Sequence, residues 1–264
     1  MDLELKGRRA VVTGSTGGIG YAAARLLAAE GASVIVNGRT QERVDDAVRR
    51  IRESVVDAEV RGVAADLSTL AGCDALAEAA GETDVLVNNV GIFQPLPFED
   101  IPDADWMRFF ETNVLSGVRL SRAFLPGMRA RDWGRIVFVS SESAQQIPAE
   151  MIHYGVTKTA QLAVARGLAE TLAGTGVTVN SVLPGPTASE GVGTFVREMA
   201  DAKGVTFEAM EREFFETARP SSLLRRFATP YEVAAMIVYV CSGRASATNG
   251  SALRVDGGVV RSIL

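Results

Sequence analysis

The chain has 264 residues, of which 47% are hydrophobic and 22% charged, and its formal net charge is −5. This is the balance of an ordinary globular protein, and the acidic charge argues against a nucleic-acid-binding surface, which needs a basic footprint. No apolar stretch approaches the ~20 residues that a membrane-spanning helix requires, and the first apolar run leads into glycines rather than into a signal-peptide cleavage region. We therefore expect a cytoplasmic protein that binds neither nucleic acid nor membranes.

Two cysteines and a single histidine limit the chemistry that the chain can carry. Cys73 and Cys241 lie far apart in the sequence, and we expect both to be buried free thiols of a reducing cytoplasm. A single histidine, His153, and two cysteines that are far apart in the sequence do not make a credible metal-binding cluster. We therefore expect no metal site.

Short apolar runs predict strands at residues 9–13, 33–37, 60–64, 85–88, 135–140, 177–182 and 253–255. Between the first of them, residues 18–30, 41–54 and 71–80 carry apolar side chains at the three- and four-residue spacing of helices. Strands that alternate with helices predict βαβ units and a parallel sheet, and the almost wholly apolar strands indicate helices on both faces. Because no linker or repeat divides the chain, residues 1–264 are expected to form a single domain.

A glycine cluster, Thr13-Gly14-Ser15-Thr16-Gly17-Gly18-Ile19-Gly20, joins the first predicted strand to the first helix. Glycines let the backbone turn tightly and approach a pyrophosphate, and the helix N-terminus supplies free N–H groups and a positive dipole end. A glycine cluster alone is a weak signal, but here a second strand follows within ~30 residues, as in dinucleotide-binding units. The sequence therefore predicts a dinucleotide site.

The end of the second predicted strand bears on which dinucleotide is bound. An acidic residue there would accept hydrogen bonds from a ribose 2′-hydroxyl and favour NAD. The sequence instead has Asn37-Gly38-Arg39, and Arg39 offers a guanidinium to a 2′-phosphate. NADP(H) is therefore preferred and NAD(H) remains possible, because Arg39 could also simply begin a surface helix.

The strand at residues 135–140 leads into Ser141, and Tyr154 and Lys158 follow in a predicted helix. A hydroxyl at the carboxyl end of a strand points into the crevice where open α/β sheets bind ligands. Tyrosine and lysine four residues apart share one helix face. We expect the lysine charge to lower the tyrosine pKa from about 10, which would make Tyr154 a general acid for carbonyl reduction or a base for alcohol oxidation.

Residues 187–224 interrupt the strand–helix alternation. The segment is polar overall but carries aromatic and methionine side chains at roughly helical intervals, namely Phe195, Met199, Phe207, Met210, Phe214 and Phe215. One interpretation is a pair of surface helices that each bury one face. The other is a mobile lid over a substrate pocket, since long insertions in compact domains are often functional. The two are compatible, and the apolar residues suggest a partly apolar substrate.

Taken together, these motifs resemble those of the short-chain dehydrogenase/reductase family, including its 3-oxoacyl-[acyl-carrier-protein] reductase-like members. The resemblance covers nearly the whole chain and adds Asn88-Asn89-Val90-Gly91, Asn113, Pro184-Gly185-Pro186-Thr187 and the ending Val255-Asp256-Gly257-Gly258. It implies a Rossmann-type, doubly wound α/β fold with seven parallel strands, helices on both faces and a small helical substrate lid. It also implies a homotetramer or homodimer, whose interface would be the helices at 113–129 and 152–173.

The resemblance assigns roles to individual residues. The implied catalytic residues are Asn113, Ser141, Tyr154 and Lys158. The implied cofactor-binding residues are Gly14, Ser15, Thr16, Gly18, Ile19, Gly20, Arg39, Asp66, Leu67, Asn89, Gly91, Tyr154, Lys158, Pro184, Gly185 and Thr187. In the implied mechanism a hydride passes between nicotinamide and the carbonyl carbon while Tyr154 supplies the proton and Ser141 holds the oxygen. Asn113 would hold a water in a proton relay to Lys158.

Three positions depart from the family pattern. Val90 replaces an alanine, which is a small packing change, and Gly17 stands where many NADP-preferring relatives have a basic residue, which weakens the argument from Arg39. Glu142 directly follows the implied catalytic serine. We expect its side chain to turn outward; otherwise it places a carboxylate near the pocket and disfavours anionic substrates.

By position, the pocket candidates are Phe93, Gln94, Gln145, Gln146, Met151 and His153, although adjacent helical residues diverge by about 100° and His153 is expected at the surface or pocket rim. The leading hypothesis is an NADPH-linked 3-oxoacyl-type or general carbonyl reductase. An NAD-linked dehydrogenase of a steroid, cyclic or sugar-derived alcohol is the alternative within the same chemistry. A catalytically silent nucleotide-sensing module is the alternative from another class.

Overall fold

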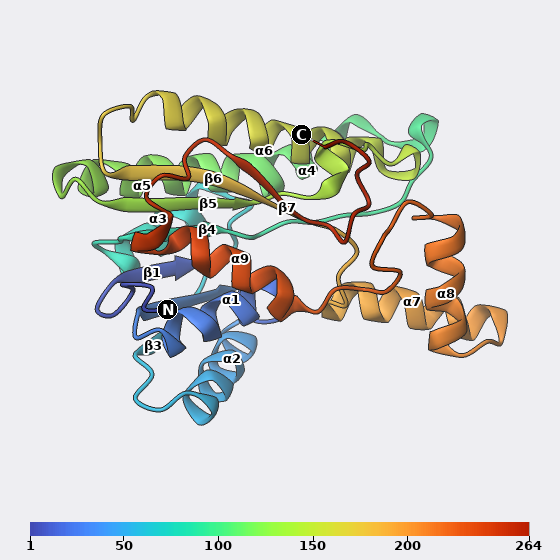
Figure 1. Cartoon of the computed structure of the whole chain (residues 1–264), viewed down its shortest axis with the longest axis horizontal. Helices are drawn as coiled ribbons and strands as arrows, with labels where there is room; N and C mark the ends of the chain where they lie inside the picture. The colour runs from blue at the N-terminus through green and yellow to red at the C-terminus, as the bar shows by residue number, and fades with distance from the viewer. Residues whose placement is uncertain (264) are drawn as a thin grey trace.

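The computed structural model describes residues 1–263, apart from the side chains at positions 190, 191, 194, 195 and 198. Its strands form one parallel sheet in the order β3-β2-β1-β4-β5-β6-β7 (Figure 1). They are β1 (Arg9–Val12), β2 (Ser33–Gly38), β3 (Val60–Ala64), β4 (Val85–Asn88), β5 (Gly134–Val139), β6 (Val177–Pro184) and β7 (Ala252–Val255). The predicted seven-stranded parallel sheet is confirmed.

The order of the strands reverses between β1 and β4, because the chain first winds outward to β3 and then crosses back. In a sheet of this kind the crevice outside the carboxyl ends of the strands, at the point of reversal, is where ligands bind. The loops after β1, β4, β5 and β6 all leave the sheet on that side (Figure 1). They carry the glycine cluster, Gly91, Ser141 and Gly185.

Helices cover both faces of the sheet (Figure 1). On one face lie α1 (Gly18–Ala29), α2 (Gln41–Ser54) and α9 (Pro230–Cys241), and on the other lie α3 (Leu70–Ala80), α5 (Ser116–Ala130) and α6 (Ile152–Glu170). Neighbouring residues of a strand point to opposite faces, so that Val12 packs in the core under α1 while Val11 packs in the core under α3. Apolar strands are therefore required, as the sequence indicated.

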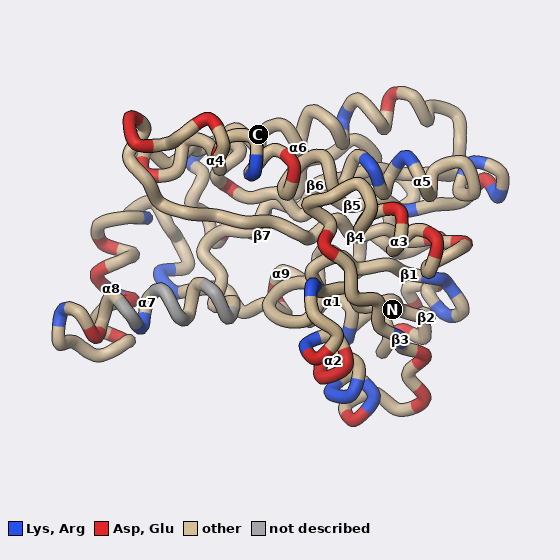
Figure 2. Tube along the Cα trace, turned by 180° about the vertical axis from the view of Figure 1, so that it is seen from behind, with Lys and Arg blue, Asp and Glu red and all other residues tan. Residues whose placement is uncertain are grey.

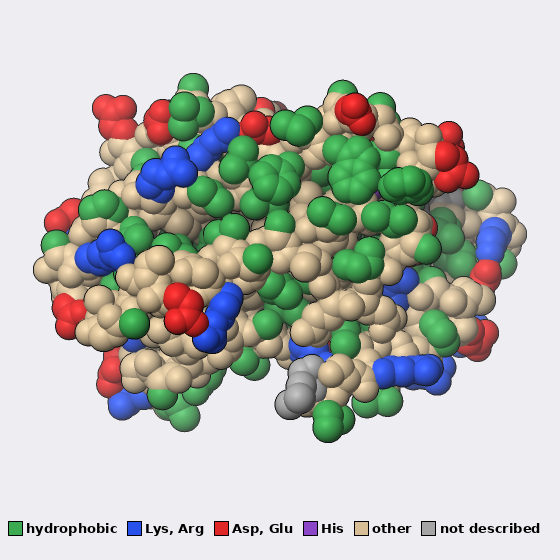
Figure 3. Space-filling model, turned by 90° about the horizontal axis from the view of Figure 1, so that it is seen from above, with side chains coloured by type: hydrophobic (Ala, Val, Ile, Leu, Met, Phe, Trp, Pro, Cys, Tyr) green, Lys and Arg blue, Asp and Glu red, His purple; other side chains and the backbone are tan. Residues whose placement is uncertain are grey.

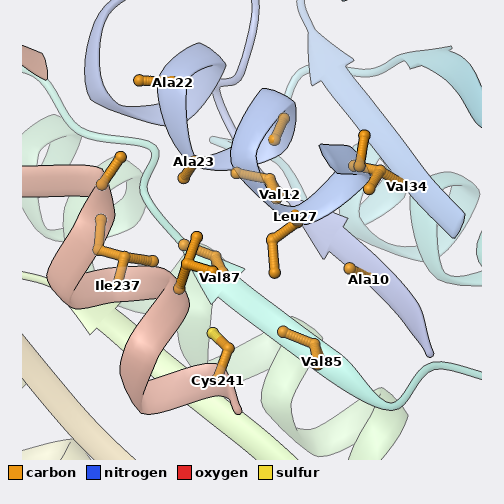
Figure 4. Close-up of a cluster of buried hydrophobic side chains, with 14 of the residues drawn as sticks. Ala10, Val12, Ala22, Ala23, Leu27, Val34, Val85, Val87, Ile237 and Cys241 are labelled. Carbon is orange, nitrogen blue, oxygen red and sulfur yellow. The ribbon is translucent and has the colours of Figure 1, made fainter. Parts of the chain in front are cut away.

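Close packing between α1 and α9 holds the start of α1 in place. Ala23 and Leu27 of α1 lie against Ile237 and Cys241 of α9 over the sheet, and all four side chains are buried (Figure 4). Cys73 is buried in the core on the other face, and both cysteines are free, as predicted. The small side chains on α1 let the helix lie close to the sheet, which fixes the position of its N-terminus.

Two features of the helices differ from the sequence prediction. The chain enters α5 through α4 (Asp103–Phe110) and a π-helical turn (Glu111–Leu115), where one helix over residues 113–129 was expected. Such π turns are rare and occur frequently at functional sites. Helix α9 was not predicted, although Thr229 and Glu232 form a capping box and Pro230 occupies the first helical position.

The segment after β6 forms α7 (Glu190–Lys203) and α8 (Phe207–Thr217), which lie beyond the carboxyl ends of the strands (Figure 1). Val196, Ala200, Met210, Phe215 and Phe227 form a small buried core between them. The expected pair of helices, each burying one face, is thus confirmed, while the side chain of Phe195 lies outside the described residues. Because Met210 and Phe215 are consumed by this core, they do not support the inference of a partly apolar substrate.

The surface carries charges of both signs, most visibly along α2, where basic and acidic residues alternate (Figure 2). There Arg49 pairs with Asp46 and Glu53 one turn away on either side. Such exposed pairs add little to stability, because solvent and salt screen them. Among the described helices, none combines the length and the apolar character that a membrane crossing requires.

Candidate active site

The loop between β1 and α1 requires glycine. Gly14 has a φ of +59°, which glycine adopts readily and other residues rarely do. A Cβ on Gly20 would lie 2.4 Å from Asn89 Nδ2 and 2.5 Å from the Gly14 carbonyl oxygen, so no side chain fits there. The N-cap of α1 is Gly17, without a side-chain cap, which leaves the first N–H groups and the positive dipole end for an anion. This cradle fits a dinucleotide pyrophosphate.

Side chains from β1 and the loop after β4 hold this turn. Thr13 Oγ1 accepts hydrogen bonds from the backbone N–H groups of Asn89 at 2.8 Å and Val90 at 3.0 Å. In return, Asn89 Nδ2 donates to the carbonyl oxygens of Thr13 and Gly14, each at 3.0 Å. The Asn89 amide is therefore a brace that ties the glycine turn to the neighbouring strand.

The hydroxyl and N–H groups of Ser15 make hydrogen bonds within the protein. Its hydroxyl donates to the Val12 carbonyl at 2.6 Å and accepts from the Asn37 N–H at 3.0 Å, while its own N–H donates to the Asn37 carbonyl at 2.8 Å. Thr16 and Ile19, by contrast, are partly exposed in the turn. Of the cofactor contacts implied for this loop, the polar groups of Ser15 are thus already satisfied.

Arg39 follows directly after β2, and its side chain is exposed. The end of β2 lies beside the glycine turn, because a Cβ on Gly38 would be 2.4 Å from Thr16 Cγ2. In the described part of the chain no carboxylate or carbonyl pairs with the Arg39 guanidinium. It is therefore available to a phosphate group beside the turn.

The loop after β3 carries the residues implied for the adenine end of a dinucleotide. Asp66 is exposed, and its Oδ1 accepts from the Ser68 N–H at 3.1 Å and from the Ser68 hydroxyl at 2.8 Å. Leu67 is buried in the core under α3, so only its backbone faces the crevice side of the chain. The carboxylate of Asp66 keeps its second oxygen for a ligand.

The segment after β6 passes close to the glycine turn. A Cβ on Gly185 would lie 2.5 Å from the Asp256 carbonyl oxygen, so this tight passage beside the chain after β7 requires glycine. Thr187 is buried, and its hydroxyl donates to the Gly185 carbonyl at 2.9 Å. Farther on, a Cβ on Gly18 would come within 3.3 Å of Ser189 Cβ. The start of α7 therefore faces the start of α1.

Tyr154, Lys158 and Ser141 come together where β5 ends. Tyr154 and Lys158 lie one turn apart on α6, with Lys158 Nζ 5.6 Å from the centre of the Tyr154 ring. Lys158 Nζ donates to the Val139 carbonyl at 3.0 Å. Gly91 lets the loop after β4 pass close to Lys158, because a Cβ added at Gly91 would lie 3.3 Å from Lys158 Nζ.

The pKa values in this cluster differ from the expectation for Tyr154. Burial raises the pKa of the Tyr154 phenol well above its usual 10, and the negative charge of Glu142 raises it further, against a smaller lowering effect of Ser141. Burial lowers the pKa of Lys158 to about 8. The expected lowering of the Tyr154 pKa was wrong for the protein without ligand, because desolvation of the phenolate outweighs the neighbouring charge.

Asn113 lies in the π-helical turn, with its side chain held on three sides. Oδ1 accepts from the Ile92 N–H at 2.8 Å, and Nδ2 donates to the Ile92 carbonyl at 3.0 Å and to Thr157 Oγ1 at 2.9 Å. The Asn113 carbonyl accepts from Gln161 Nε2 at 2.6 Å. Gln161 was not among the predicted residues, and a single glutamine on the inner face of a helix carries no sequence signal for this contact.

Glu142 does not turn outward as expected. It is buried, and Ser141 Oγ donates a hydrogen bond of 2.5 Å to Glu142 Oε2. Ser141 is also the N-cap of a short 3₁₀ turn (Glu142–Ala144), in which the Ser143 N–H donates to Ser141 Oγ at 3.1 Å. Because this turn folds back against α6, the carboxylate is carried into the site. A guanidinium, that of Arg219, faces it at 3.4 Å.

His153 was expected at the surface or the pocket rim and is fully buried instead. Its ring packs at 4.1 Å between centres on Phe109 and at 6.0 Å on Trp106, both from α4. Neither ring nitrogen has a hydrogen-bond partner among the described residues, and burial lowers the pKa of the imidazole. His153 is therefore a packing residue between α4 and α6 and not a second base.

The other pocket candidates are divided. The Phe93 ring meets the Tyr154 ring edge-on, with 6.4 Å between centres, so Phe93 lines the site. Gln94 Oε1 accepts from Arg108 on the exposed surface. Gln145 and Gln146 are exposed after the 3₁₀ turn.

Comparison with known proteins agrees with this geometry. Residues 8–200 match the family model of the short chain dehydrogenases. The chain is 46% identical to an uncharacterised oxidoreductase of Bacillus subtilis, YvaG, over the full length of both proteins, and 35% identical to a D-beta-hydroxybutyrate dehydrogenase of Cupriavidus necator over 97% of this chain and 99% of that protein. The crystal structure of L-sorbose reductase from Gluconobacter frateurii complexed with NADPH and L-sorbose superimposes with a TM-score of 0.95 at 33% identity, covering all of both chains.

Proposed function

Because this chain belongs to the short-chain dehydrogenase family and is an NAD(P)-dependent oxidoreductase, we propose that it reduces a carbonyl compound with Tyr154 as the catalytic acid. The observation that carries the proposal is the meeting of the Tyr154 phenol, the Lys158 ammonium and the Ser141 hydroxyl at the end of β5. A bound nicotinamide supplies the hydride. The residues of this chain supply the proton and hold the reacting oxygen.

The raised pKa of Tyr154 keeps the phenol in the form that carbonyl reduction needs. At neutral pH the phenol is fully protonated, and this is the form that donates a proton to a carbonyl oxygen as it gains negative charge. A Lys158 ammonium beside it stabilises the phenolate that remains. Oxidation of an alcohol would require the phenolate beforehand, which the buried site disfavours.

Ser141 is proposed to hold the substrate oxygen. Its hydroxyl lies at the carboxyl end of β5, where it donates to Glu142 Oε2 and accepts from the Ser143 N–H. A hydroxyl fixed in this way is preorganised, so that it loses little orientational freedom when it contacts a carbonyl. Asn113 is proposed to support the site from below, since its side chain joins the loop after β4 to α6.

We propose NADPH as the preferred cofactor and NADH as the alternative. Arg39 stands beside the glycine turn with an unpaired guanidinium, where a ribose 2′-phosphate would lie. The L-sorbose reductase structure and that of an actinorhodin polyketide ketoreductase, 31% identical with a TM-score of 0.86, both contain NADPH. The other cofactor contacts are proposed to be Gly14, Thr16, Gly18, Ile19, Gly20, Asp66, Gly91 and the segment 184–187, with Ser15 and Asn89 as braces.

The helices α7 and α8 are proposed to act as a lid over the substrate. Their small core lets them move as a unit. The start of α7 already approaches the glycine turn, as the contact between Gly18 and Ser189 indicates. Substrate would enter between this unit and the loop that carries Phe93.

We also propose a homodimer through α5 and α6, which could pair again into a tetramer. Figure 3, seen from the side of α4 and α6, shows hydrophobic side chains gathered on this face. They include Val156 on α6, 44% exposed, and Met107 on α4, 61% exposed. The small residues Ala163 and Gly167 continue the face along α6 and allow a second helix to approach closely.

A cytoplasmic location stays a prediction.

A panel of ketones, aldehydes and secondary alcohols tests the proposed function. The purified protein is mixed with NADPH or NADP⁺, and cofactor absorbance is followed for each compound. We expect carbonyl-dependent NADPH oxidation with at least one class of ketone. Hydride transfer to or from no compound in the panel, with bound cofactor demonstrated separately, would favour the silent nucleotide-sensing module instead.

A further inference from the structure

The segment after α8 contributes a cation to the active site that the sequence did not reveal. The Arg219 side chain is only 13% exposed, and its Nε faces Glu142 Oε1 at 3.4 Å. Its Nη1 donates to the Ala218 carbonyl at 2.8 Å and faces Glu150 Oε1 at 3.4 Å. Arg219 thus reaches from the proposed lid to the carboxylate that directly follows the catalytic serine.

The carboxylate of Glu142 is held firmly beside the reacting centre. Its side chain is 7% exposed, and its Oε2 is 2.5 Å from Ser141 Oγ. It is also close enough to Tyr154 and Lys158 for its charge to raise the pKa of both. The Glu142 carboxylate therefore lies beside the groups that would hold the substrate oxygen.

Both charged groups keep hydrogen-bonding capacity. A carboxylate offers about four lone-pair sites, and a guanidinium offers five N–H donors. Glu142 uses one site for Ser141 and one long contact for Arg219, and Arg219 Nη2 makes no hydrogen bond to the described residues. Buried polar groups left with unused capacity cost free energy unless a ligand completes them.

The charges of this cluster select among substrates. Two carboxylates, Glu142 and Glu150, share the single guanidinium of Arg219, and the Lys158 ammonium lies near enough to Glu142 for the two charges to interact. Glu142, whose carboxylate contacts the Ser141 hydroxyl, would repel an anionic group of the substrate placed beside it. An apolar chain next to the carbonyl would bury both charges and displace water from them. It would offer no hydrogen bonds in place of those that the water made.

A hydroxyl group fits both partners at once. Its hydrogen can be donated to the Glu142 carboxylate, and its oxygen can accept from Arg219. From these contacts we propose that Glu142 and Arg219 form a hydroxyl-binding subsite, and that the substrate is a neutral carbonyl compound with a hydroxyl on the carbon next to the carbonyl. The inference rests on the proposed carbonyl reduction at Tyr154 and names its substrate class.

The subsite predicts strong discrimination against analogues that lack the hydroxyl. Sites built to hydrogen-bond a substrate hydroxyl reject the analogue without it, because their own buried polar groups are then left unpaired. The matched probes are hydroxyacetone and butanone, which have the same number of heavy atoms and differ by a hydroxyl in place of a methyl group. Pyruvate is the anionic probe.

The measurement is kcat/KM for NADPH-dependent reduction of each probe by the wild type, Glu142→Gln and Arg219→Lys. We expect the wild type to prefer the hydroxylated member of a pair at least about tenfold and to reject pyruvate. Each variant should reduce that preference about tenfold, mainly through KM. In Glu142→Gln the hydroxyl loses its charged acceptor, and in Arg219→Lys it loses the donor geometry of the guanidinium, although the positive charge remains. The matched control is Glu150→Gln, whose carboxylate contacts the same guanidinium from the exposed side and whose preference should stay within about twofold.

A further readout, the pH profile, and a second variant separate this role from a loss of folding. Glu142→Gln removes a charge that raises the Tyr154 pKa, so the alkaline decline of reduction should move to lower pH in this variant, whereas a folding defect would not move it. Arg219→Lys serves if Glu142→Gln does not fold. An equal rate with butanone and hydroxyacetone, or an unchanged preference in folded variants, would overturn the subsite and leave the reductase intact. No reduction of any carbonyl would overturn both.

Discussion

Lys158 illustrates how a single buried charge serves function at the cost of stability. The side chain is 4% exposed and has one hydrogen bond, to the Val139 carbonyl, and burial lowers its pKa from the usual 10.5 to about 8. At pH 7 the ammonium is charged in both the folded and the unfolded chain, so the full cost of burying it is present. That cost corresponds to about 3 kcal/mol.

Lys158→Met should therefore stabilise the protein at pH 7 by up to about 3 kcal/mol while abolishing turnover. Between pH 8 and 10.5 the unfolded wild type binds more protons than the folded one, so its stability rises with pH and the gap to the variant narrows. Urea unfolding of both proteins at pH 7 and pH 10 measures this. A gap that is the same at both pH values would show that the buried charge is not its origin.

We expect the cofactor preference to be decided at one residue, Arg39. Arg39→Ala should lower NADPH affinity about 10- to 100-fold, because a charge-assisted contact to phosphate contributes about 1.5–3 kcal/mol. NADH affinity should change less than about twofold, since its ribose carries no phosphate. Fluorescence titration with both cofactors provides the measurement. The assignment of Arg39 would be wrong if the variant bound NADPH as tightly as the wild type while its NADH affinity was also unchanged.

Sequence patterns were sufficient to predict that Ser141, Tyr154 and Lys158 lie together, because strand ends and helix spacing fix which backbone positions meet. They did not give the orientation of Glu142 or the burial of His153. Both depend on how a short turn and α4 pack against α6, which is a tertiary contact. Arg219 comes from a distant segment, and no local pattern marks it.

The glycine turn shows what an element imposes on its sequence. Gly20→Ala places a methyl group 2.4 Å from Asn89 Nδ2 and 2.5 Å from a carbonyl oxygen, so the turn and the start of α1 must shift. We expect a destabilisation of about 1–3 kcal/mol and at least a tenfold loss of NADPH affinity, measured by thermal unfolding and titration.

Gly193→Ala is the matched control within a helix. Among the described side chains, its Cβ would meet the end of Arg197 alone, at 3.5 Å, so alanine should stabilise α7 by about 0.5–1 kcal/mol. NADPH affinity should not change. Equal tolerance of alanine at both positions would contradict the close packing described for the glycine turn.

The order of strands and helices was readable from the chain because apolar strands and amphipathic helices alternate so regularly. The π-helical turn at Asn113 could not be predicted from the sequence, because its hydrogen bonds span only one residue more than those of an α-helix. It is held by contacts of the Asn113 side chain with Ile92 and Thr157. Helix α9 carried a capping-box signal, in Thr229 and Glu232, that an apolar-run analysis does not register.

The assembly of the whole molecule can be tested on the face of α6. Val156→Glu places a charge on the proposed interface and should shift the protein to a smaller species in analytical ultracentrifugation. Val205→Glu is the control, because Val205 is similarly exposed, at 40% against 44%, but lies between α7 and α8. A monomeric wild type, or an oligomer that persists in Val156→Glu, would count against this interface.

The central assignment, Tyr154 as the proton donor, is tested most directly by Tyr154→Phe, which removes one hydroxyl and keeps the ring that packs on Phe93. For a carbonyl that the wild type reduces, we predict a fall in kcat of about 10²- to 10⁴-fold, with NADPH affinity unchanged within about threefold. Normal turnover in this variant, with NADPH bound, would contradict the assignment.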